Sequence, residues 1–149
     1  MPHIIVDGYN IIRRIPHFLS AERKGLESGR YALLLALEEY AAAFGYRVTV
    51  VFDAGGRPLH LDAAVPRAEK FAGIDIIFSA RGESADTAIE KLLAEIRNAK
   101  SDGLVPFDEA QVVVSDDLAI RDVAIEHGAF ARSADELFDS MKAGKRLFF

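Results

Sequence analysis

The chain has 149 residues, half of them apolar and 28% charged, which is the composition of one ordinary globular domain. It contains no cysteine, and this excludes disulfides, thiolate metal sites and cysteine nucleophiles. The net charge of −5 argues against a protein that coats duplex nucleic acid by charge alone, although acids that hold cations suit a nuclease. We expect no signal peptide and no membrane span, and therefore a cytoplasmic location.

The N-terminal half predicts a strand, a helix and a second strand. The apolar runs at residues 3–6 and 47–52 are typical of strands covered on both faces, as in parallel sheets. Between them, residues 28–44 carry leucines at helical spacing, and Gly45 is a suitable C-terminal stop. Residues 54–72 contain two glycines and two prolines, and they predict an irregular connection.

The next strands and helices alternate in the same way. Residues 74–79 predict the third strand, and a helix over 84–98 follows, with Ser84 as its N-cap. The fourth strand is predicted at 110–115, with a helix over 117–127 behind it.

A short fifth strand at 129–131 and a helix from Ser133 complete the chain, and Glu136 stands at the capping-box position of that helix. Alternating strands and helices predict a doubly wound α/β domain over residues 1–149, with a mostly parallel sheet of about five strands.

Four aspartates fall where strands end. Asp7, Asp53 and Asp116 follow predicted strands directly, and Asp86 lies at the start of the helix after the third strand. In a parallel sheet these points share the C-terminal edge, where open α/β sheets bind ligands. Converging carboxylates repel one another unless a hard cation such as Mg²⁺ or Mn²⁺ is present, and such a site suggests phosphate chemistry.

Each aspartate also has a structural interpretation. Asp117 precedes a helix, so we expect it to act as an N-cap. Asp53 is followed by Ala54 and two glycines, and a turn former and a ligand are equally compatible with that context. The joint pattern at four successive strand ends favours a site over four independent turns.

Four short motifs carry a family resemblance. They are Asp7-Gly8-Tyr9-Asn10, Val51-Phe52-Asp53, Gly82-Glu83-Ser84-Ala85-Asp86 and Val114-Ser115-Asp116. In this order and spacing they resemble the NYN domain of the PIN-like nucleases, and most closely its bacterial YacP-like branch. The resemblance covers nearly the whole chain.

This resemblance implies a three-layer α/β/α, PIN-like (Rossmann-like) fold and Mg²⁺- or Mn²⁺-dependent endonucleolytic hydrolysis of RNA. It implies that Asp7, Asp86 and Asp116 are the principal metal-site acids, with Asp53 beside them as a fourth catalytic acid. It also implies that two polar residues of the same edge, Asn10 and Ser115, orient water, metal or phosphate. Members of the YacP-like branch are associated with RNA cleavage, in some cases with the ribosome as partner, and single-stranded mRNA is the expected substrate.

Further candidates for substrate contact come from the loops around this edge. Arginine suits phosphate geometry, although a solvated surface arginine is an equally good interpretation of each one. For Tyr9, packing in the core is favoured over stacking on a base. The candidates are Ser84, Arg13, Arg57 and Arg81, with Arg14 beside Arg13.

Two other functions compete with the ribonuclease. One is a non-catalytic module of the same fold that binds RNA or the ribosome, which loss of a key acid would favour; all four acids are present. The other is a phospho-acceptor signalling domain with Asp53 as acceptor. That reading is weak, because Gly8 follows Asp7 where such domains carry paired acids. The sequence leaves the oligomeric state open.

Overall fold

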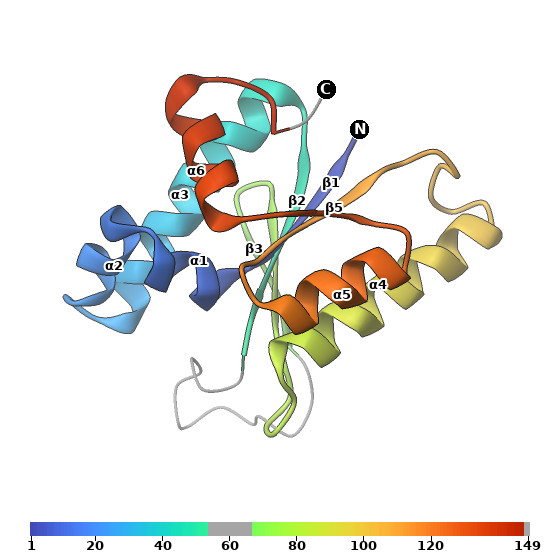
Figure 1. Ribbon diagram of the computed structural model, residues 1–149, viewed down its shortest axis with the longest axis horizontal. Helices are drawn as coiled ribbons and strands as arrows, with labels where there is room; N and C mark the ends of the chain where they lie inside the picture. Colours follow the sequence, from blue (N-terminus) through green and yellow to red (C-terminus); the bar gives the residue numbers. More distant parts are fainter. Residues whose placement is uncertain (54–66, 148–149) are drawn as a thin grey trace.

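The protein is built on a six-stranded sheet, seen in a computed structural model that describes residues 1–53 and 67–147 (Figure 1). The strand order is β3-β4-β2-β1-β5-β6, and in the described part of the chain every neighbouring pair is parallel except β3 with β4. The predicted α/β class and mostly parallel sheet are therefore confirmed, with six strands instead of about five. The strands are β1 His3–Asp7, β2 Arg47–Phe52, β3 Arg67–Phe71, β4 Ile74–Phe78, β5 Gln111–Val114 and β6 Phe130–Arg132.

Helices cover both faces of this sheet and make three layers. Figure 1 shows α1, α2, α3 and α6 on one side and α4 and α5 on the other. The helices are α1 Gly8–Arg14, α2 Pro16–Glu22, α3 Leu26–Phe44, α4 Ala85–Ser101, α5 Leu118–Glu126 and α6 Ala134–Ala143.

The continuous apolar strands follow from this layering. Ile4 and Val6 of β1 pack with the helices α1, α2, α3 and α6, whereas Ile5 packs with α4 and α5. All three side chains are fully buried. A central strand covered on both faces has no position for a solvated side chain, so polarity appears only at its ends.

Residues 67–71 correct the sequence analysis, which placed them in an irregular connection. They form β3, an antiparallel edge strand joined to β4 by Ala72 and Gly73. Charged residues such as Glu69 and Lys70 interrupt its apolar pattern. Edge strands commonly carry such charges because they discourage pairing with other chains, and here they conceal the strand from a search for apolar runs.

The helices α1 and α2 were also missed, because the first helix was expected only from residue 28. α1 begins immediately after β1, and its buried Ile11 and Ile12 pack on the core. A Cβ atom on Gly8 would lie 2.3 Å from Cε1 of Phe52, so only glycine allows the chain to turn this closely over β2. The glycine of the Asp7-Gly8 motif thus has a packing role.

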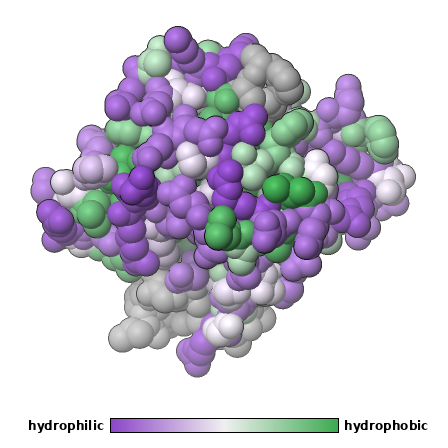
Figure 2. All heavy atoms as spheres, in the orientation of Figure 1, coloured by the Kyte–Doolittle hydropathy of each residue, from purple (hydrophilic) through white to green (hydrophobic). Residues whose placement is uncertain are grey.

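The described surface is mostly hydrophilic. On the face seen in Figure 2, apolar residues form small separate patches among polar ones. The large apolar side chains that are most exposed are Phe107, Leu104, Leu118 and Met1. Within the described residues, we find no helix with the length and hydropathy needed to cross a bilayer.

Candidate active site

A cleft of about 570 Å³ opens at the C-terminal ends of the parallel strands. Its lining includes all four predicted acids, Asp7, Asp53, Asp86 and Asp116. Asp7 is the last residue of β1, Asp53 follows β2, Asp116 lies two residues beyond β5, and Asp86 is in the first turn of α4. The structure therefore brings together carboxylates that are up to 109 positions apart, from Asp7 to Asp116, as the shared edge of a parallel sheet requires.

Asp7 is the most buried of these acids, with 7% of its surface exposed. The Ser115 hydroxyl donates a hydrogen bond to its Oδ2 at 2.8 Å. Burial raises the pKa of the Asp7 carboxyl from 3.8 to about 6; the Ser115 hydrogen bond opposes this rise, and the charges of Asp117, Asp53 and Asp86 add to it. At neutral pH the folded protein therefore destabilises the ionised carboxylate of Asp7, and a cation in the cleft would offset this cost.

Asp116 is held differently, by contacts from two segments, α1 and the start of α6. Its backbone N–H donates to Oδ1 of Asn10 at 2.9 Å, and its own Oδ1 accepts from the backbone N–H of Ala134 at 3.1 Å. Its Oδ2 lies 3.5 Å from Nε of Arg14. Asp116 therefore stands at the junction of α1, β5 and the start of α6.

Asp117 caps α5, as the sequence predicts. Its side chain accepts from the backbone N–H groups of Ala119 at 2.9 Å and Ile120 at 3.4 Å. Its own backbone N–H donates to the Ser115 hydroxyl at 3.0 Å. Ser115 thereby connects the helix cap to Asp7, with its oxygen accepting from one and its proton donated to the other.

The predicted substrate residues fall into separate groups. Asn10, Ser84 and Arg13 line the cleft. Ser115 is completely buried behind Asp7, so it can orient that acid but cannot contact substrate directly. Arg81 is exposed in the turn before α4 and is not part of the cleft lining, so its role as a substrate contact stays a prediction. Arg57 lies outside the described residues.

Ser84 occupies the predicted N-cap position of α4, but its side chain makes no capping hydrogen bond. Its hydroxyl lies 3.1 Å from that of Thr87 instead. The capping box predicted for Ser133 and Glu136 is present in full. Of the two serines at N-cap positions, only Ser133 makes capping hydrogen bonds to its helix.

Two cleft features were not predicted as parts of the site. Tyr9 is buried, as expected, yet it also lines the cleft and accepts a hydrogen bond from Nη1 of Arg30 at 2.9 Å. The guanidinium of Arg13 lies 4.9 Å from the Tyr9 ring centroid, and the Phe52 ring lies at 4.9 Å as well. Arg30 is 20 residues from Asn10 in sequence and lies near the start of α3, so no local pattern indicates its role.

The donor set of the cleft fits a hydrated divalent cation. Among the residues that the structure describes, no three His, Asp or Glu side chains are grouped closely enough to enclose a metal ion. Mg²⁺ typically keeps several waters and uses one or two carboxylates, so it does not need such a cage. The chemistry of the donors, all carboxylate oxygen, and the unfavourable charge of Asp7 both suit that ion.

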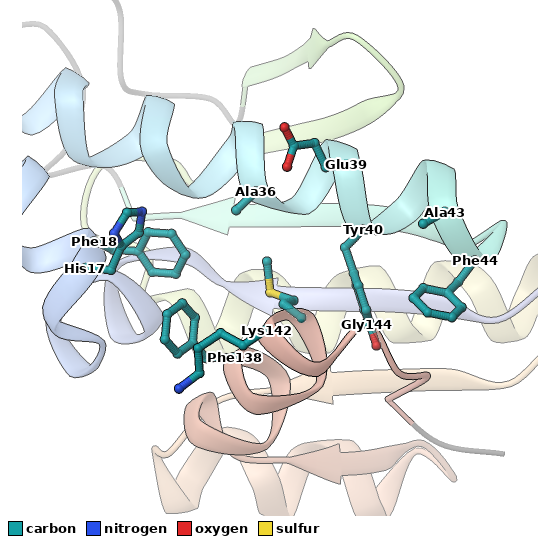
Figure 3. A pocket seen from close by; sticks show the side chains of 11 residues that line it. His17, Phe18, Ala36, Glu39, Tyr40, Ala43, Phe44, Phe138, Lys142 and Gly144 are labelled. Atoms are coloured by element: carbon teal, nitrogen blue, oxygen red, sulfur yellow. The ribbon is translucent and has the colours of Figure 1, made fainter.

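A second hollow lies among α2, α3 and α6, away from the acids (Figure 3). Its volume is about 420 Å³, and rings of Phe18, Tyr40, Phe44 and Phe138 point toward it. It has one acid, Glu39, on its α3 side. Its lining suits apolar contacts and offers no converging carboxylates.

Comparisons with known proteins support the family resemblance that the sequence motifs indicate. Residues 4–147 match the profile of the YacP-like NYN domain family. The YacP protein of Bacillus subtilis (strain 168) is 29% identical over 147 residues, which are 98% of this chain and 78% of that protein. The crystal structure of Rae1 (YacP) from Bacillus subtilis has a TM-score of 0.73 at 28% identity, covering 96% of this chain and 75% of that one. A Rae1 variant gives 0.74 at 27% identity, covering 96% and 76%. The PIN-like fold expected from the resemblance is thereby confirmed.

Proposed function

The chain belongs to the YacP-like NYN domain family, and from this premise we propose that it is a Mg²⁺- or Mn²⁺-dependent endoribonuclease. The family implies a nuclease-type function related to RNA. The observation that carries the finer proposal is the convergence of four carboxylates on one open cleft, where burial, and after it the charges of neighbouring aspartates, raise the pKa of Asp7.

Asp7, Asp86 and Asp116 would hold the cation, with Asp53 beside them. When bound, a divalent cation neutralises such acids, polarises the phosphodiester and lowers the pKa of a water nucleophile. We expect hydrolysis that leaves 5′-phosphate and 3′-hydroxyl ends, the usual outcome of carboxylate–metal hydrolysis.

The protein's own groups would keep the acids in place. The hydroxyl of Ser115, which itself accepts from the backbone N–H of Asp117, fixes Asp7, while the N–H of Ala134 fixes Asp116. Such preorganisation matters because catalytic groups lose efficiency when they must first be positioned.

The rim of the cleft would contact the RNA backbone. Arg13 and Arg14 lie on one side, at the end of α1, and can meet phosphate oxygens. The net charge of −5 gives little non-specific attraction to a duplex. The proposed substrate is therefore single-stranded RNA, with mRNA on the ribosome as the candidate in which a partner supplies positioning.

The test is cleavage of a labelled single-stranded RNA with Mn²⁺ or Mg²⁺, with ribosome-bound mRNA as a second substrate. The wild type is compared with Asp116→Asn and with Asp122→Asn, a control that removes an exposed acid from α5. We expect Asp116→Asn to lose about two orders of magnitude in rate, the usual effect of removing a catalytic group, and Asp122→Asn to resemble the wild type.

The competing proposal is a binding module of the same fold. It would use the same cleft and its rim arginines to hold RNA without cutting it. Cation binding without cleavage of either substrate would support it and contradict the nuclease.

A further inference from the structure

The carboxylate of Asp116 already has a partner on each oxygen. Oδ1 accepts from the backbone N–H of Ala134 at 3.1 Å, and Oδ2 lies 3.5 Å from Nε of Arg14. A cation that approaches Asp116 must therefore share this acid with an arginine. Asp7 differs, because its recorded side-chain partner is the neutral hydroxyl of Ser115.

The two partners of Asp116 differ in how easily they can leave. Ala134 is completely buried and opens α6, whose first turn is fixed by the capping box of Ser133 and Glu136. Arg14 has 57% of its side chain exposed and ends a seven-residue helix. Because exposed ion pairs are weak and flexible, Arg14 is the exchangeable partner and Ala134 the permanent one.

Arg14 has a second carboxylate within reach. Its Nη2 donates to Oδ2 of Asp135 at 3.0 Å, so the guanidinium bridges Asp116 and Asp135. Asp135 follows Ala134 directly in the first turn of α6 and is exposed. The arginine can thus turn away from Asp116 toward the rim without losing all of its hydrogen bonds.

We propose that Arg14 is the counter-ion of Asp116 in the cation-free protein and transfers to an RNA phosphate when a divalent cation binds. This inference rests on the proposed function of the same cleft. The cation and the Arg14 guanidinium compete for the carboxylate of Asp116. An RNA phosphate that binds the guanidinium removes this competition. RNA and cation therefore strengthen each other's binding, and by linkage the factor is the same in both directions. Arg14 is a positioning residue that makes cation binding depend on substrate.

Titration with Mn²⁺ followed by calorimetry measures this coupling without any turnover. It is done with and without a single-stranded 2′-O-methyl phosphorothioate oligonucleotide, whose integrity is checked after each run. Wild type is compared with Arg14→Met and with Arg13→Met. Arg13 is a matched control because it is 56% exposed, lines the same rim and pairs with Glu22 instead of Asp116.

Without the oligonucleotide, we expect Arg14→Met to bind Mn²⁺ about fivefold more tightly, the factor that matches release of an exposed ion pair. Arg13→Met should change Mn²⁺ affinity by less than about twofold. The oligonucleotide should tighten Mn²⁺ binding in the wild type and in Arg13→Met, and should lose this effect in Arg14→Met.

A second variant, Asp135→Asn, tests the bridge from the other side. It removes the competing anchor of Arg14, so Mn²⁺ binding without RNA should weaken, by about twofold. Equal effects of Arg14→Met and Arg13→Met, or equal coupling in all variants, would overturn the exchange while leaving the metal site intact. Failure of every protein to bind Mn²⁺ would instead contradict the proposed metal dependence, and the exchange with it.

Discussion

The two ends of the sheet hold polar clusters of opposite character. At the N-terminal end, Nε2 of His3 and the Thr49 hydroxyl are 2.7 Å apart, and Nζ of Lys100 donates to Oε1 of Gln111 at 2.8 Å and to the carbonyl of Glu109 at 2.6 Å. Donors there meet acceptors. At the C-terminal end, acids of one sign face one another across an open cleft.

The difference separates stability from function. At the N-terminal end most polar groups have partners, as buried polar groups generally require, although the buried Nδ1 of His3 has no hydrogen-bond partner among the described residues. At the other end, burial and, after it, the charges of neighbouring acids raise the pKa of Asp7, so an unfavourable charge stays in the folded state. Such local destabilisation is what a ligand site retains for its ligand.

The largest expected effect comes from Asp7→Asn. Cleavage should fall by about two orders of magnitude or more, because the variant removes a buried acid of the proposed site. In the presence of a chelator at pH 7, the same variant should be more stable than the wild type, by up to about 3 kcal/mol, since a pKa raised by about two units corresponds to that free energy. Chemical unfolding measures the second effect. If Asp7→Asn lost both activity and stability, Asp7 would have a structural role, like the paired polar residues at the N-terminal end of the sheet.

The pH dependence of stability should distinguish the two ends by sign. Asp7 has a folded pKa of about 6, above its ordinary 3.8, so its ionisation removes stability as pH rises through this window. Burial, and secondarily the Arg47 charge, lower the pKa of His3 from 6.5 to about 4, so protonation of the unfolded chain removes stability as pH falls from 6.5 to 4. Each amounts to about 3 kcal/mol, and the two oppose each other.

The measurement is chelator-treated unfolding of wild type and Asp7→Asn between pH 4 and 7. The stability advantage of the variant should be largest at pH 7 and should become small near pH 4, where Asp7 is protonated in the folded state and about half protonated in the unfolded state. A constant difference across this range would contradict the raised pKa of Asp7.

At the N-terminal end, His3→Leu should cost about 2 kcal/mol, because it leaves the buried Thr49 hydroxyl without its partner. Adding Thr49→Val should recover part of this loss, since replacing both partners by apolar groups is close to neutral. Unfolding of the two single variants and the double variant gives the coupling. Cleavage activity per folded molecule should stay unchanged. A loss of activity would show that the N-terminal end of the sheet also contributes to the function.

The smallest effect is expected at Asp117. Asp117→Ala should cost about 1 kcal/mol through loss of the α5 cap, whereas Asp117→Asn should retain most of that stability. Cleavage should fall far less in either variant than in Asp116→Asn. If variants of Asp117 and Asp116 lost cleavage activity equally, the assignment of Asp117 as a helix cap and of Asp116 as a site residue would be wrong.

Much of this comparison was predictable from the sequence at the level of strands. β1, β2, β4 and β5 are interior strands made mostly of apolar residues, so the aspartates that follow them stand out, and parallel pairing gathers these at one edge. The cap of Asp117 was predictable as well, because it depends only on its neighbours.

The rest depends on contacts between distant segments. Arg14, Asp116 and Ala134 meet only after three elements have packed, and no local pattern specifies such a meeting. The roles of Arg30 and Ser115 have the same origin, since each acts through a partner far along the chain. β3 was missed for a different reason, because its charges hide the strand pattern.

The N–H of Ala134 that holds Asp116 has a consequence for synthesis of the protein. A growing chain contains Asp7, Asp53 and Asp86 long before it contains the start of α6, and chains are made from the N-terminus. Until about residue 134 has left the exit tunnel, the fourth acid lacks its fixed partner. Under the proposed function, the acidic site would therefore be complete only after α6 has docked.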